Sequence, residues 1–271
     1  MKHFISAILL CFALHALGNQ DSIMCYNMKL SINKGVQKFN SLNAKFKRAD
    51  VAMIYNLLNL EFNISDTLPS SQTLVDSNTS LNESYFKLYN RYFHNRTQAI
   101  NRDSLTVHSI LYKSLDNIDS RTLWSFYCNK YPMPPDVFTY ICSYLQKFSY
   151  DYTHAVLHVY NISENKCAPD TITKSMLQQS YRRLELMAHE NLMSNFELDL
   201  KIECIALLAY MKQYNRIQKS DWQLLLDTQN EDGSWSASRN TLEPTPGNEH
   251  TTILALWALL EGHRHLQNVK K

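Results

Sequence analysis

Histidines and carboxylates at the starts of three apolar stretches are the residues of this chain best suited to chemistry. His154 and His250 each open such a stretch, and Asp199 and Glu203 lie at the start of a third. His154 and His158 are four residues apart, as are Asp199 and Glu203, so each pair would share one face of a helix. Two imidazoles with one or two carboxylates form a candidate site for zinc or another divalent metal.

Two other uses of these side chains remain open. In an enzyme, His154 and His250 would act as acid–base or metal-binding residues, with Asp199 as the carboxylate that orients them. In a binding protein, the helix N-termini would themselves favour a carboxylate or phosphate ligand. A histidine at a helix start is also common as a cap or core residue, and His-x-x-x-His without the glutamate of a metalloprotease motif is not specific.

The three stretches recur at a spacing of roughly fifty residues, which suits helix pairs stacked in a ring. In such a ring the inner helices run roughly parallel, so their N-terminal ends converge at one mouth. We therefore expect His154, Asp199, Glu203 and His250 to face a shared cavity at that mouth.

Residues 218–262 have the pattern of a helix, a glycine turn, a polar loop and a second helix. Gln229-x-x-x-Gly233-x-Trp235 resembles the QW repeat of terpene cyclases such as squalene–hopene cyclase. The apolar helix that starts near His250 is similar to the inner-barrel helix that follows such a repeat. Protein prenyltransferase β subunits and thioester-containing complement domains share this fold. The resemblance implies an all-α chain of the α/α-toroid class; the alternative is an ordinary helical hairpin.

The activities of those families are not implied, because their chemical motifs are missing. His250 has a place similar to that of the zinc-ligand histidine of prenyltransferase β subunits, but their Asp and Cys ligands have no counterpart. The Asp-x-Asp-Asp acid of the cyclases, the paired diphosphate-binding motif and the Cys-Gly-Glu-Gln thioester signature are all absent.

The composition favours an all-helical fold, and the N-terminal segment favours export. Glycine (5) and proline (7) are scarce among 271 residues, and strands need turns that favour them. A basic start and a short apolar run predict a signal peptide at 1–18, followed by an N-terminal helical region at 19–100 and toroid helices at 101–271. Within these regions the apolar pattern predicts helices near 28–42, 49–62, 81–99, 103–116, 151–160 and 170–189. Removal of 1–18 leaves 26 basic and 25 acidic side chains, so nucleic-acid binding has no electrostatic support. No later segment is long enough for a membrane span.

Export would place the cysteines in an oxidising compartment. Cys11 leaves with the signal peptide, and an odd number remains, which allows at most two intramolecular disulfides. Glycosylation is expected at Asn-x-Ser/Thr sequons. The remaining cysteines are Cys25, Cys128, Cys142, Cys167 and Cys204, and the sequons begin at Asn63, Asn78, Asn82, Asn95 and Asn161.

These observations predict a secreted helical-barrel protein that binds a glycan, a small polar ligand or an extracellular protein. The alternative is an extracellular (α/α)-barrel enzyme, similar to glycan hydrolases or lyases, that uses the His/Asp cluster with or without a divalent metal.

Overall fold

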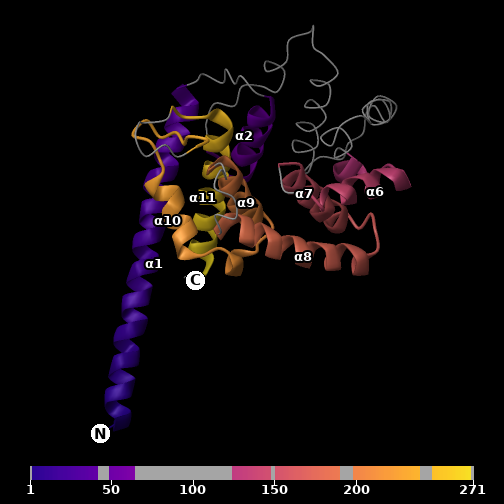
Figure 1. Cartoon of the computed structure of the whole chain (residues 1–271). Helices are drawn as coiled ribbons and strands as arrows, with labels where there is room; N and C mark the ends of the chain where they lie inside the picture. Colours follow the sequence, from indigo (N-terminus) through magenta and orange to yellow (C-terminus); the bar gives the residue numbers. More distant parts are fainter. Residues whose placement is uncertain are drawn as a thin grey trace.

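The computed structural model describes residues 2–41, 49–64, 124–147, 150–189, 198–238 and 246–269, and this part of the chain is helical without a β-sheet (Figure 1). The predicted all-α class is therefore confirmed. Within the same residues, no helix combines the length and the apolar character needed to cross a membrane. The named helices are α1 (Lys2–Ser41), α2 (Ala49–Phe62), α6 (Pro135–Tyr144), α7 (Tyr150–Glu164), α8 (Asp170–His189), α9 (Leu198–Tyr210), α10 (Lys219–Asp227) and α11 (Glu249–Val269).

Helices α9 and α11 form the centre of the molecule. Residues 202–209 of α9 and 250–262 of α11 are buried without interruption, as expected for helices that are surrounded on all sides. Helix α9 packs against α11, α8 and α7, and α11 packs against α1 and α2 as well. Helices from both ends of the chain therefore share one hydrophobic core.

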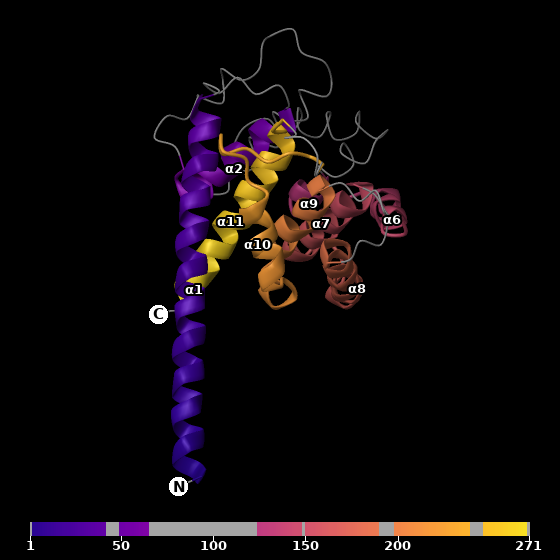
Figure 2. The same ribbon diagram turned by 60° about the vertical axis from the view of Figure 1, so that its left-hand side comes forward.

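Helix α1 is a single long helix whose N-terminal half projects away from the other helices (Figures 1 and 2). The sequence predicted a helix only from about Met28, whereas the backbone is helical from Lys2. The side chains of Met28, Ile32 and Phe39 are buried in the core, and α1 packs against α10 and α11. These contacts all lie C-terminal to the predicted signal peptide at 1–18.

The QW-like motif joins α1, α10 and α11. Gln229 donates from Nε2 to the Ser31 carbonyl of α1 at 2.9 Å and accepts from Ser31 Oγ at 2.8 Å. The buried Trp235 indole donates to the Leu225 carbonyl of α10 at 2.8 Å, and its backbone N–H donates to Thr252 Oγ1 of α11 at 3.0 Å. The Gln and Trp of the motif thus fix three helices to one turn.

Gly233 lets this turn approach α1 closely. Its φ is +85°, a conformation that side chains disfavour. A Cβ built there would lie 2.3 Å from the Lys34 carbonyl oxygen. Glycine is therefore required at this position for two reasons: the positive φ of the turn and the close contact with the backbone of α1.

Most of the described helices match the sequence prediction. Helices α2 and α8 have the expected bounds of 49–62 and 170–189. Helix α7 was predicted at 151–160 but continues to Glu164, because Ile162 is also buried in the core. The helices predicted at 81–99 and 103–116 lie outside the described residues.

One disulfide, Cys128–Cys167, links the segment before α6 to the turn after α7. Cys25 and Cys142 are half-buried free thiols, and Cys204 is a buried one. The structure therefore contains one of the two disulfides that the cysteine count allowed.

Candidate functional site

The N-terminal ends of α7, α9 and α11 meet at the carboxylate of Asp199. Tyr150, the first residue of α7, donates to Asp199 Oδ2 at 2.8 Å. From α11, His250 Nδ1 lies 3.0 Å from Oδ2 and 3.2 Å from Oδ1, and Thr251 Oγ1 donates to Oδ1 at 2.5 Å. Asp199 is 6% exposed and His250 is 9% exposed, so this contact is largely shielded from water.

The environment of Asp199 favours its charged form. Burial by itself would raise the pKa of this carboxyl, but hydrogen bonds from His250, Thr251 and Tyr150 and the charge of His250 together lower it. A carboxylate at this position can therefore hold the three helix starts together or act as a ligand to a cation.

Glu203 lies one helical turn beyond Asp199 on the same face of α9. Its Oε1 accepts a hydrogen bond from Thr153 Oγ1 at 2.7 Å and lies 3.6 Å from His154 Nε2. Its Oε2 is buried and has no hydrogen-bond partner within the part of the chain that the structure describes, and the residue is 4% exposed. Burial raises the pKa of this carboxyl, although the nearby His154, His250 and Thr153 oppose the rise.

Asp199, Glu203 and His250 can each offer one donor atom such that all three atoms lie within 4.8 Å of one another. Donors around a tetrahedral zinc ion lie about 3.3 Å apart, as follows from metal–ligand distances near 2.0–2.1 Å. The His250–Asp199 separation of 3.0 Å is already close to that value. A three-ligand set would require Glu203 to move toward the other two groups and the ligating nitrogen of His250 to be deprotonated.

The structure places His154 and His158 in different environments. His154 has a side chain that is 36% exposed and reaches Glu203, so it lies at the edge of the cluster. His158 was expected among the metal ligands, but it is buried one turn further along α7, where Nδ1 contacts Ser125 Oγ at 2.9 Å. Burial lowers the pKa of His158 well below its usual range, and the nearby His154 lowers it further. The structure thus places His158 outside the group formed by Asp199, Glu203 and His250.

The sequons also fall into different environments. Asn161 is 3% exposed inside α7, and its Nδ2 atom is buried. The glycosylation predicted at Asn161 therefore falls on a buried amide. Asn63 is exposed just after α2. The predicted sites at Asn78, Asn82 and Asn95 lie outside the described residues.

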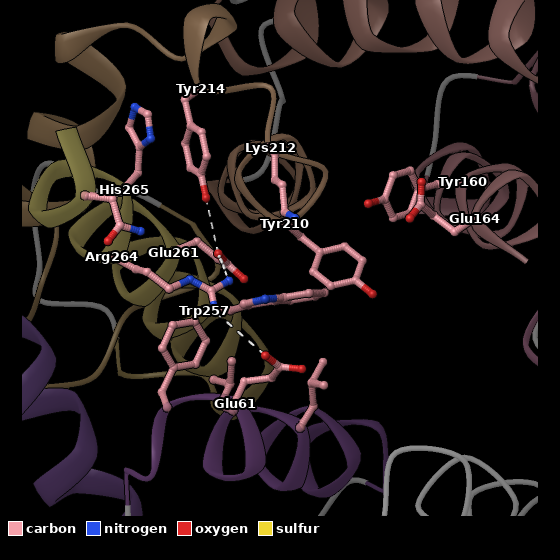
Figure 3. Close-up of a pocket in the computed structure, with 14 residues that line it drawn as sticks. Glu61, Tyr160, Glu164, Tyr210, Lys212, Tyr214, Trp257, Glu261, Arg264 and His265 are labelled. Carbon is pink, nitrogen blue, oxygen red and sulfur yellow. Dashed lines mark hydrogen bonds and ion pairs between the residues drawn. The ribbon is translucent and has the colours of Figure 1, made fainter. Parts of the chain in front are cut away.

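A second candidate site was missed by the sequence analysis. A cavity of about 510 Å³ opens at the C-terminal ends of α7, α9 and α11, with α2 on its far side (Figure 3). The abundance of tyrosine, 16 residues in the chain, is a signal of composition that gives no position. The aromatic side chains that line the cavity are Phe62, Tyr160, Tyr210, Tyr214 and Trp257.

Comparison of the chain with protein-family models, curated proteins and solved structures finds no match. The function must therefore be argued from the two sites themselves.

Proposed function

We propose that this chain is a secreted helical protein that binds a divalent metal ion through Asp199, Glu203 and His250 and uses this centre to hold a polar ligand or partner. The observation that carries the proposal is Glu203 Oε2, a buried oxygen that has no hydrogen-bond partner among the described residues and lies beside two further donor groups. Leaving such an oxygen without a proton or a cation is costly in free energy.

The chemistry of the donor set fits a divalent ion. Two carboxylates balance the charge of the ion, and imidazole is a common ligand of zinc and other transition metals. Tyr150 and Thr251 donate to Asp199, and Thr153 donates to Glu203. Hydrogen bonds of this kind hold the ligating carboxylates in fixed orientations.

The toroid arrangement and export belong to the same proposal. The α10–turn–α11 hairpin and the convergence of three helix starts at Asp199 support an α/α-toroid. The Cys128–Cys167 disulfide supports an oxidising compartment. Cleavage after residue 18 would remove only part of the projecting half of α1. Asn63, which is exposed, is a candidate glycosylation site of the exported protein.

The test is metal content of the purified secreted protein after loading with Zn²⁺ or Mn²⁺ and removal of free ions. We expect near-stoichiometric metal in the wild type and its loss in Glu203→Gln and in the double variant His154→Ala, His250→Ala. Glu261→Gln is the matched control, because Glu261 is equally buried (3% exposed) but lies outside the cluster. A wild-type protein that retains neither ion would refute the metal centre.

A second function, metal-assisted hydrolysis or elimination on an extracellular glycan, is favoured by His154. Its Nε2 lies 3.6 Å from Glu203, a carboxyl whose pKa is raised by burial. An exposed imidazole beside such a carboxyl can move a proton to or from a bound substrate. His154→Gln would then abolish turnover while the protein keeps its metal; equal activity in wild type and variant would exclude this role.

A further inference from the structure

The cavity at the C-terminal ends of α7, α9 and α11 has two different walls. One is aromatic: the rings of Tyr160 and Tyr210 are 5.7 Å apart, and those of Tyr210 and Trp257 are 5.0 Å apart. Tyr160 and Tyr210 are half-buried, whereas Trp257 is 5% exposed. The two tyrosines therefore present the accessible ring surface, and Trp257 packs against Tyr210.

The second wall is a hydrogen-bonded charge network centred on Arg264, which lies beside Trp257 (Figure 3). Its guanidinium donates to Glu261 Oε2 at 2.5 Å and lies 3.7 Å from Glu61 Oε2 of α2. Tyr214 donates to the same Glu261 oxygen at 3.3 Å. Each carboxylate has about four lone-pair sites, so these contacts leave further acceptor capacity for a ligand in the cavity.

The charges around the cavity nearly balance. Three carboxylates, of Glu61, Glu164 and Glu261, face two cations, of Lys212 and Arg264. A strongly charged ligand would gain little from such a lining. The cavity volume of about 510 Å³ falls within the range of small-molecule sites, roughly 300–1,000 Å³.

From this combination we infer that the cavity binds a neutral saccharide of one or two rings. The apolar face of a sugar ring packs on an aromatic ring, as apolar surface does in small-molecule sites. Its hydroxyl groups both donate and accept, and they match carboxylate acceptors alternating with guanidinium, ammonium and phenol donors. No metal is required for this contact.

The saccharide site is independent of the proposed metal centre. Asp199 and Tyr210 stand eleven residues apart on α9, which separates the two sites by about 16 Å along the helix axis. Sugar binding should therefore survive treatment with a chelator, so failure of one proposal leaves the other intact.

The experiment is titration calorimetry of the full secreted chain with N,N′-diacetylchitobiose, cellobiose, maltose and lactose, each up to about 10 mM, a range that detects millimolar affinity. Spermidine and citrate serve as charged probes. We expect saturable binding of at least one disaccharide and none of the charged probes.

Two variants locate the binding. Tyr160→Ala removes one accessible ring and should weaken binding about tenfold, the loss expected for one aromatic contact. Tyr144→Ala is the control, since Tyr144 is also half-buried but lies on α6 outside the cavity. Glu61→Gln, at an exposed position, should weaken binding without disturbing the fold.

The inference is overturned if no disaccharide binds, or if spermidine or citrate binds in their place. It is also overturned if a disaccharide binds but Tyr160→Ala and Glu61→Gln both retain wild-type affinity. Melting temperatures of the variants, compared with that of Tyr144→Ala, separate lost binding from lost folding.

Discussion

Replacement of Asp199 by asparagine should destabilise the protein even when no metal is present. Asp199 accepts hydrogen bonds from Tyr150 and Thr251 and pairs with His250, so its charge joins the starts of α7, α9 and α11. Asparagine keeps the shape but replaces one acceptor oxygen with a donor N–H₂, which would face donors already directed at it. Breaking a buried charge pair costs about 3–5 kcal/mol, and we expect a loss of that size in the free energy of unfolding.

The assay is urea unfolding at neutral pH in the presence of a chelator, so that only protein contacts contribute. Asp227→Asn is the control, because Asp227 is an exposed residue of α10 that accepts from Gln223 at 2.7 Å. Its effect should stay within about 0.5 kcal/mol. If Asp199→Asn is as mild as this control, then Asp199 does not hold the three helix starts together, and the reasoning is refuted.

Three further predictions concern contacts away from this carboxylate. Gly233→Ala should lower the free energy of unfolding by at least about 2 kcal/mol, because a Cβ at φ +85° is strained and meets the α1 backbone; a urea midpoint equal to that of wild type would contradict this. Replacing Cys128 and Cys167 by serine should cost up to about 4 kcal/mol, since their separation of 39 residues closes a long loop; unfolding of the two proteins under identical conditions measures it. Asp232 has its pKa lowered to about 2 by hydrogen bonds from Lys38 and Ser234. Because the pKa of Asp232 is lower in the folded state, the stabilisation that its carboxylate provides is complete above the model-peptide pKa of 3.8. This stabilisation is lost as the pH falls toward 2. Asp232→Asn should therefore cost less than about 1 kcal/mol at neutral pH and nothing near pH 2.

The sequence could predict the polar cluster only in part. Helix starts that carry His250 and Asp199 recur along the chain; the sequence analysis expected them to meet, and the two side chains are in contact. The spacing of His154 and His158 placed both on one face of α7, but a step of four residues also advances about 6 Å along the axis. That step moves His158 into the core beside Ser125, a residue to which the sequence analysis assigned no role.

The helical class, the bounds of α2 and α8 and the Gly233 turn were determined by the sequence alone. Local chemistry is sufficient for these features: apolar residues recur with the helical period, and only glycine suits the turn. The tertiary structure decided which side chains became buried and which met. The cavity brings Tyr160, Tyr210 and Trp257 together from three helices. Whether Glu203 Oε2 meets a hydrogen-bond donor depends on the helices packed around it, and the described ones supply none. Neither feature has a sequence pattern, because each is a property of packing between distant segments.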